Sequence, residues 1–172
     1  ERTLEFARDR GARAGKSAAE AVSGADVVVT CLSTSADVAS LLDAEVVGAF
    51  DSGATLVDCT SGDPATSRRL ATRLSERGIA FVDAPVSGGV KGAEDGTLTV
   101  MCGGDEHDIE RVRPVLEAFG KKIVHCGPVG AGDAVKAMNQ ALLAPTIWGT
   151  GEALAALAKS GVSAQVALDV MN

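Results

Sequence analysis

The sequence Asp83-Ala-Pro-Val-Ser-Gly-Gly89 is followed about fifty residues later by Gly130-Ala-Gly-Asp-Ala-Val-Lys136-Ala-Met-Asn139. The first stretch ends an apolar segment in a turn rich in proline and glycine, where a hydroxyl and several backbone N–H groups can face an anion. The second places Lys136 and Asn139 one turn apart near the start of a long predicted helix. An anion-holding loop beside a proton-donating ammonium group suits redox chemistry on a small hydroxy acid.

Strand-like and helix-like segments alternate around these two stretches. Apolar segments predict strands at residues 25–32, 54–59, 79–82, 97–102 and 122–126, and the segments before and between them predict helices at 2–10, 17–24, 35–50, 63–77 and 106–119. This alternation is typical of a parallel sheet covered by helices. From Gly130 to about Ser160 the pattern is continuously helical, and Ser163 begins another helix.

We therefore predict an α/β fold with two parts. Residues 1–128 form an incomplete Rossmann-type domain, a doubly wound parallel sheet that binds dinucleotides. Residues 129–172 form an interdomain helix and the start of an all-helical domain, with the boundary near Gly127-Pro128.

The glycine fingerprint of a dinucleotide-binding domain is missing from its usual place. Such a domain opens with a strand, the pattern G-x-G-x-x-G and a helix. This chain opens in a predicted helix, and Gly127-Pro-Val-Gly130-Ala-Gly132 has reversed spacing and follows the last predicted strand. We therefore expect an interior segment of a longer enzyme, lacking about one βαβ unit of about 30 residues at its start. Most of a helical domain is expected to follow its end.

Composition excludes several classes of function. The 172 residues are 46% hydrophobic with 20 glycines, as in an α/β protein packed with small aliphatic side chains. The net charge of −7, without a basic stripe, argues against nucleic acid as a partner. The uncharged segment 137–151 is shorter than the roughly 17–25 residues that cross a bilayer, so we expect a buried helix and no membrane.

The cysteines give no sign of a metal site. Four occur, without a C-x-x-C pair or a histidine at ligand spacing: Cys31, Cys59, Cys102 and Cys126. Each lies in or beside an apolar, β-branched segment. We expect small buried hydrophobic residues in a reducing cytoplasm, and no bound metal.

Taken alone, the two opening stretches also have structural explanations. Ser-Gly-Gly is common in ordinary turns, and a lysine on a helix is usually solvated. Lys136, however, has apolar neighbours from Ala134 to Met138. Burial among them would lower the pKa of the lysine and let it exchange a proton near neutral pH.

Together the two stretches resemble the signature segments of the β-hydroxyacid dehydrogenases. This family includes 3-hydroxyisobutyrate and tartronate semialdehyde dehydrogenases and is related to 6-phosphogluconate dehydrogenase. The first match continues from Asp83 through Gly96-Thr-Leu-Thr99 to Gly104, and the second has the pattern Gly130-x-Gly-x-x-x-Lys136-x-x-Asn139. The resemblance covers essentially the whole chain.

The resemblance implies roles for individual residues. The substrate carboxylate would be held by Ser87, Gly88 and Gly89. Lys136 would give a proton to the carbonyl oxygen during reduction and take it back in reverse, and Asn139 would orient the substrate. The implied reaction is hydride transfer between NAD or NADP and a small 3-hydroxy acid or its semialdehyde.

Two further segments follow predicted strands, where a doubly wound sheet presents its ligands. The family usually has Leu-Pro at the first, and this chain has Leu32-Ser33. At the second, Asp58-Cys-Thr60-Ser61 preserves the hydroxyl-bearing pattern of the family. The resemblance makes Leu32, Ser33, Thr60 and Ser61 contacts of the cofactor. Without it, ordinary turn and cap chemistry explains both segments.

Alternatives remain open at this point. Val90 with Leu98-Thr99 favours the 3-hydroxyisobutyrate branch of the family. An imine-reductase-like relative is the nearer alternative, although those enzymes generally lack the lysine at position 136. A non-catalytic oligomerisation or binding module is the alternative from another class. We expect the segment to be inactive alone and to form a homo-oligomer, because the apolar helix 134–158 would otherwise be exposed.

Overall fold

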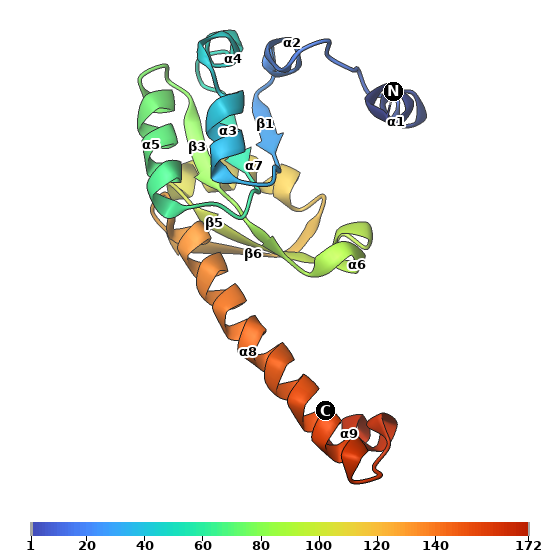
Figure 1. Cartoon of the computed structure of the whole chain (residues 1–172). Helices are drawn as coiled ribbons and strands as arrows, with labels where there is room; N and C mark the ends of the chain where they lie inside the picture. Colours follow the sequence, from blue (N-terminus) through green and yellow to red (C-terminus); the bar gives the residue numbers. More distant parts are fainter. Residues whose placement is uncertain (1, 172) are drawn as a thin grey trace. The chain divides into compact units, whose positions relative to one another are not determined.

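The computed structural model describes residues 2–171, which form two compact units (Figure 1). The first unit ends at Lys136 and the second begins at Ala137. The predicted domain boundary at residue 128 stays a prediction.

The first unit alternates helices and strands. In chain order these are α1 (Arg2–Arg10), α2 (Ala18–Val22), β1 (Val27–Thr30), α3 (Ser35–Leu41), α4 (Ala44–Ala49), β2 (Thr55–Asp58), α5 (Pro64–Ser75), β3 (Ala80–Asp83), β4 (Val86–Ser87), α6 (Gly89–Glu94), β5 (Leu98–Gly103), α7 (Glu106–Leu116), β6 (Gly120–Gly127) and the first residues of α8 (Ala131–Lys159). The predicted strands are confirmed in order, mostly shorter or shifted by a residue or two, and the predicted helices are confirmed except for 35–50.

The sheet joins six strands in the order β1-β2-β3-β5-β4, with β6 beside β5. Strands β1, β2 and β3 are parallel, whereas β5 runs antiparallel to both β3 and β4. The predicted Rossmann-type class is confirmed, but the sheet is mixed. The segment after Pro85, predicted as a loop, forms β4 and then α6, and Val86 pairs with Val100 of β5.

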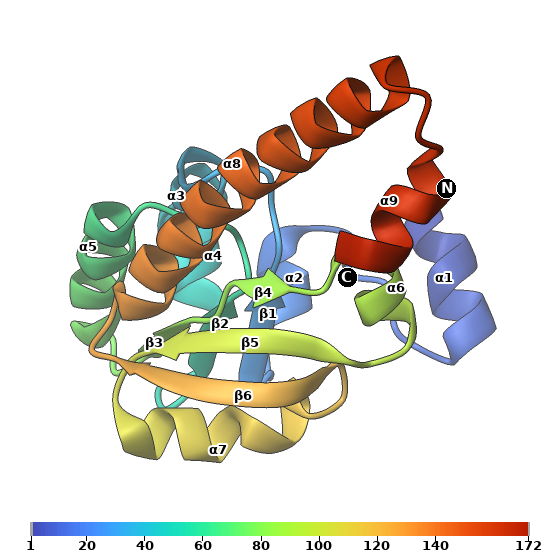
Figure 2. The same cartoon turned by 90° about the horizontal axis from the view of Figure 1, so that it is seen from below.

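Two apolar clusters lie on the two faces of this sheet. Figure 2 shows the helices that cover these faces, α7 on one side and α3, α4 and α5 on the other. Leu56 of β2 and Phe81 of β3 pack with α3, α4 and α5 on one face. Val57 and Val82, the next residues along the same strands, pack with α7 on the other. Every residue of β2 is buried, as is typical of a central parallel strand covered on both faces.

Local caps explain where several helices begin. The predicted helix 35–50 is wrong as one helix, because Asp43 interrupts it and accepts a hydrogen bond from the Val46 amide at 2.9 Å. Aspartate is a strong N-cap residue, so a second helix, α4, begins there. The predicted cap of α2 is confirmed, since Ser17 Oγ accepts from the Glu20 amide at 3.2 Å.

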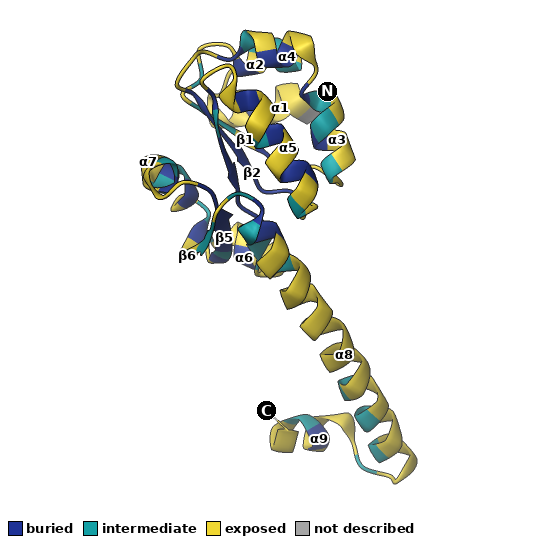
Figure 3. Cartoon of the chain, turned by 90° about the vertical axis from the view of Figure 1, so that its left-hand side faces the viewer, coloured by how far each residue is buried: buried dark blue, intermediate teal, exposed yellow. Residues whose placement is uncertain are grey.

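The second unit contains the rest of α8 and α9 (Ala164–Met171). The prediction of a buried helix is wrong for α8, whose apolar side chains are largely exposed in this structure (Figure 3). Leu142 and Trp148 are each 73% exposed. Among the described residues, α8 is the one helix long and apolar enough to cross a membrane, a test that core helices of soluble proteins also pass.

Candidate active site

The ends of β1 and β2 bring the two predicted cofactor segments together. The Leu32 amide donates to Thr60 Oγ1 at 3.0 Å. Behind them, Asp58 Oδ1 accepts from Thr30 Oγ1 at 2.9 Å and from the Thr60 amide at 3.1 Å. Thr60 is therefore buried and hydrogen-bonded, whereas Leu32, Ser33 and Ser61 are exposed at the carboxyl edge of the sheet.

The predicted carboxylate-binding turn follows β4. Ser87 is half-buried, and Gly88 and Gly89 are exposed. Both glycines have positive φ, 140° and 65°, a backbone conformation that side chains with a Cβ rarely adopt. A Cβ at Gly88 would also lie 2.9 Å from Leu98 Cδ2. The turn therefore needs glycine for its shape and leaves its backbone accessible.

Lys136 reaches this turn from the start of α8. Its Nζ donates to the Val86 carbonyl oxygen at 2.8 Å, across fifty residues of sequence. Val86 precedes Ser87, so the structure brings the predicted proton donor to the predicted carboxylate-binding turn. Lys136 is half-buried, but Ala134 and Val135 are exposed, so these neighbours do not enclose it.

Asn139 lies in the second unit and is exposed. Its Nδ2 donates to Gln140 Oε1 at 3.5 Å. Its role in orienting the substrate stays a prediction.

Asp83 is a central residue to which the sequence analysis assigned no role. It is 1% exposed, its Oδ1 accepts from the Gly130 amide at 2.7 Å, and its Oδ2 accepts from the Asp133 amide at 3.0 Å. A Cβ at Gly103 would lie 2.5 Å from Asp83 Oδ1, and a Cβ at Gly132 would lie 2.8 Å from Oδ2. The glycines thus make room for a carboxylate that fixes the start of α8 to the end of β3.

Asp133 connects the same helix to the segment after β2. It is 2% exposed, its Oδ1 accepts from the Gly62 amide at 3.1 Å, and its Oδ2 accepts from Ser67 Oγ at 2.6 Å. Gly62 follows Ser61 directly. The helix turn that carries Lys136 is therefore linked to the predicted cofactor segment by one buried carboxylate.

Burial dominates the electrostatics of both carboxylates. It raises the pKa of Asp83 to about 6, although the two N–H donors favour the charged form. Burial likewise raises the pKa of Asp133 above its ordinary value, against the hydrogen bonds from Ser67 and Gly62. At neutral pH Asp83 is therefore ionised at a cost in stability.

We expect this cost to appear as a pH dependence of folding. A carboxyl group whose pKa rises on folding binds its proton more tightly in the folded chain, so its penalty is absent below about pH 4 and complete above about pH 6. For Asp83 the difference corresponds to about 3 kcal/mol. The free energy of unfolding should therefore fall between pH 4 and pH 7, as measured by urea denaturation.

Asp83→Asn removes the titrating group and should flatten this part of the pH profile. It should also cost about 1–2 kcal/mol at pH 4, because the amide NH₂ cannot accept one of the two backbone N–H groups. Asp63→Asn is the matched control, since hydrogen bonds from Thr66 lower the pKa of this exposed carboxyl. An equal pH dependence in wild type and Asp83→Asn would contradict the assignment.

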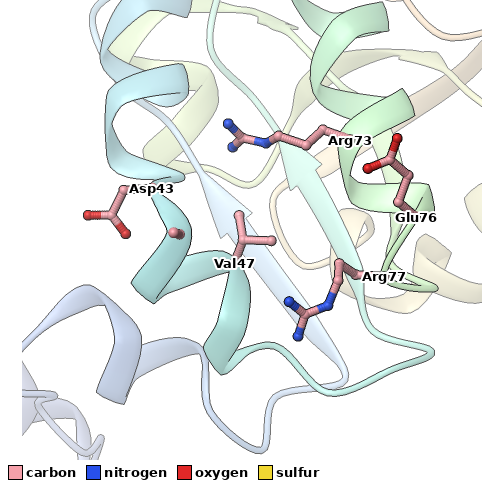
Figure 4. Close-up of a pocket in the computed structure, with 6 residues that line it drawn as sticks. Asp43, Val47, Arg73, Glu76 and Arg77 are labelled. Carbon is pink, nitrogen blue, oxygen red and sulfur yellow. The ribbon is translucent and has the colours of Figure 1, made fainter.

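Two cavities in the first unit are formed by other residues. One cavity of about 300 Å³ lies beside α4, with the Arg73 side chain extending from α5 and the Arg77 side chain from the segment just after it (Figure 4). It is lined by Asp43, Ala44, Val47, Arg73, Glu76 and Arg77. Another of about 490 Å³ is lined by Gly104, Asp105, Glu106, His125, Gly127, Pro128 and Val129. Neither lining includes a predicted site residue.

Comparison with known proteins decides the family. Residues 1–127 match the model of the NAD-binding domain of 6-phosphogluconate dehydrogenase, and residues 130–172 match the NAD-binding model of NADP-dependent 3-hydroxyisobutyrate dehydrogenase. The chain belongs to the β-hydroxyacid dehydrogenase family. This confirms the predicted family and its cofactor, NAD or NADP.

Individual relatives agree with this membership. An NAD-dependent L-serine dehydrogenase of Pseudomonas aeruginosa is 45% identical over 164 residues, 94% of this chain and 55% of that protein. A 3-hydroxyisobutyrate dehydrogenase of the same organism is 39% identical over 166 residues, 95% of this chain and 56% of that protein. This dehydrogenase family member thus spans little more than half the length of the curated relatives that it matches.

Solved structures show the same fold. The 3-hydroxyisobutyrate dehydrogenase of Mycobacterium tuberculosis with L-serine is 40% identical, with a TM-score of 0.89 over 97% of this chain and 57% of that one. An imine reductase of Myxococcus stipitatus with NAD⁺ is 25% identical, with a TM-score of 0.87 over 98% of this chain and 58% of that one.

The residues present fit one part of a dinucleotide. Leu32 is 39% exposed, and with the exposed hydroxyls of Ser33 and Ser61 it offers an apolar contact beside hydrogen-bonding groups. That combination suits a nicotinamide ring and its ribose. The sequence contains no G-x-G-x-x-G pattern to hold the pyrophosphate.

Proposed function

We propose that this protein contributes the substrate and proton-transfer part of an NAD- or NADP-dependent dehydrogenase of small 3-hydroxy acids. The observation that carries the proposal is the 2.8 Å contact between Lys136 Nζ and the Val86 carbonyl oxygen. It holds an ammonium group beside Ser87 and its two glycines, so that one substrate can present its carboxylate to the turn and its hydroxyl to the lysine.

In this reaction the nicotinamide supplies the hydride donor or acceptor. The Ser87 hydroxyl and the backbone amides of Gly88 and Gly89 hold the carboxylate. Lys136 takes the hydroxyl proton during oxidation and returns a proton to the carbonyl oxygen during reduction. Ser61, Leu32 and Ser33 hold the nicotinamide end of the cofactor, and the buried Thr60 positions Leu32 by accepting its amide N–H.

The names of three relatives narrow the substrate class. They are dehydrogenases of L-serine, 3-hydroxyisobutyrate and, in Eubacterium barkeri, 2-(hydroxymethyl)glutarate. Each of these acids carries a hydroxymethyl group on the carbon next to a carboxylate. We therefore propose a 2-substituted 3-hydroxypropanoate as substrate, and 3-hydroxyisobutyrate as the first member to test.

The test measures oxidation of these three acids with NAD and with NADP, monitored by the absorbance of the reduced cofactor. Two proteins are compared. One is this chain alone, and the other is a chimera in which this chain replaces the matching segment of the P. aeruginosa serine dehydrogenase. Oxidation of at least one acid by the chimera supports the proposal. If the chimera binds reduced cofactor but oxidises none of them, the proposal is wrong.

A non-catalytic binding module with the same fold is the second candidate. Fluorescence titration with NADH and NADPH separates the two. Saturable binding by the 172-residue chain would show that other residues replace the glycine loop. Binding by the chimera alone would assign the pyrophosphate site to the added residues.

A further inference from the structure

Two cysteines occupy neighbouring positions at the carboxyl edge of the sheet. In the parallel pair β1–β2, Val29 is in register with Val57 and Thr30 with Asp58. The Cys59 amide donates to the Thr30 carbonyl oxygen at 2.7 Å, so the two chains are still paired where the strands end. Cys31 and Cys59 are the next residues on each chain. Neighbouring strands lie about 4.8 Å apart, within the Cα separation of about 4.4–6.8 Å found in disulfides.

Alternation along the two strands predicts that the side chains of these two cysteines point to the same face. Thr30 Oγ1 donates to Asp58 Oδ1 at 2.9 Å, which places that pair together on one face. Successive side chains alternate between faces along a strand, so the next pair shares the other face. Cys59 accordingly belongs to the apolar cluster on the α7 side with Val57. Burial raises the pKa of Cys59 to about 12, and the neighbouring Cys31 thiol adds to the rise.

The two thiols differ in access. The prediction that all four cysteines are buried is wrong for Cys31, which is exposed, and for Cys126, which is half-buried, whereas Cys59 is 6% exposed. An oxidant in solution therefore meets Cys31 first. Cys59 lies behind it, in a position to attack Cys31 but shielded from solvent.

We propose that Cys31 and Cys59 form an oxidisable dithiol that hydrogen peroxide closes to a disulfide. The Cys31 sulfur attacks one peroxide oxygen, the O–O bond breaks, and Cys31 becomes a sulfenic acid with release of one water. The Cys59 sulfur then attacks the Cys31 sulfur, the S–O bond breaks, and the second water leaves with the Cys59 proton. Together the two thiols lose two protons and two electrons, and one peroxide becomes two waters.

The location gives this modification a consequence for binding. Cys31 directly precedes Leu32-Ser33, and Cys59 directly precedes Thr60-Ser61. A disulfide would fix the spacing of the two segments assigned to the nicotinamide end of the cofactor. This consequence rests on the proposed function, whereas formation of the bond does not.

The other two cysteines provide a matched control. Cys102 of β5 is in register with His125 of β6, and Cys126 comes one residue later, at an irregularity in the pairing. Cys126 adds to the raised pKa of Cys102, so these two thiols are also neighbours, but they are offset by one residue in the pairing. Because of this offset we expect Cys102 and Cys126 to stay reduced under conditions that join Cys31 to Cys59, and Cys126→Ser removes any link between them from the test.

The experiment treats the folded chain with hydrogen peroxide, blocks remaining thiols under denaturing conditions, and maps linked peptides by mass spectrometry. Wild type and Cys126→Ser should give the Cys31–Cys59 peptide with a loss of two hydrogens. Cys31→Ser should give no such link, and Cys59→Ser should accumulate a sulfenic acid on Cys31 that dimedone labels. Chain unfolded in urea should give mixed pairings.

Further oxidation of Cys31 without a link, or a different pairing in the folded chain, would overturn the proposal. Formation of the Cys31–Cys59 disulfide does not require hydride transfer. A failed dehydrogenase assay would therefore not affect the outcome of this experiment. Circular dichroism of each variant before oxidation confirms that the comparison is made on folded protein.

Discussion

Lys136→Ala is expected to lower the turnover of a 3-hydroxy acid by roughly 100- to 10,000-fold, the usual contribution of a positioned acid–base group. The Nζ that donates to the Val86 carbonyl oxygen is the group placed to exchange a proton beside the Ser87 turn. Cofactor affinity should change little, because the predicted nicotinamide contacts lie on the segments after β1 and β2. Turnover and binding of reduced cofactor are measured in the chimera described above.

Lys136→Arg separates proton transfer from charge alone. Arginine keeps the positive charge but stays protonated at any accessible pH, so its turnover should be nearly as low as that of Lys136→Ala. Lys121→Ala is the control, since this lysine is exposed on β6. Full turnover in Lys136→Ala, or in Lys136→Arg, would remove the lysine from proton transfer.

Segments with a strong local signal were predictable from the sequence. The apolar segments that became β2 and β3 are buried on both faces, so hydrophobicity alone identified them as strands. The cap of α5 was equally clear, because Asp63-Pro64 is a good N-cap and first-position pair, and Asp63 Oδ2 does accept from the Thr66 amide at 2.8 Å.

The buried carboxylates were not predictable in the same way. Asp83 meets Gly130 across 47 residues, and Asp133 meets Gly62 across 71, so no local pattern reveals either contact. An aspartate is usually exposed, and its burial here depends on space left by distant glycines. The sequence features that could have indicated a buried carboxylate were Asp83 at the end of an apolar strand and the Gly130-x-Gly132 pair.

The antiparallel part of the sheet was missed for a related reason. Val86 and Ser87 form only two residues of strand, too short to show a period, and Gly88 and Gly89 suggest a turn. Pairing with β5 determines their structure. The candidate catalytic motif was thus predicted from the sequence, whereas the contacts that place its residues depend on tertiary packing.

Gly132→Ala is expected to destabilise the first unit by about 3 kcal/mol or more, at the upper end of overpacking effects. A Cβ at this position would lie 2.2 Å from the Met101 carbonyl oxygen and 2.8 Å from Asp83 Oδ2. Both neighbours are fixed, the first by the sheet and the second by its two N–H donors. The helix start would have to move away from β5, which would break the contacts of Asp83 with Gly130 and Asp133.

Gly48→Ala is the matched control for this substitution. Gly48 lies in α4, nothing lies within 4 Å of an added Cβ, and alanine favours a helix by up to about 1 kcal/mol over glycine. The two variants should therefore shift the urea midpoint in opposite directions. Far-ultraviolet circular dichroism is the appropriate probe, because Trp148, the single tryptophan, lies in the second unit. Equal midpoints for Gly132→Ala and wild type would show that α8 does not begin against β5 as the structure has it.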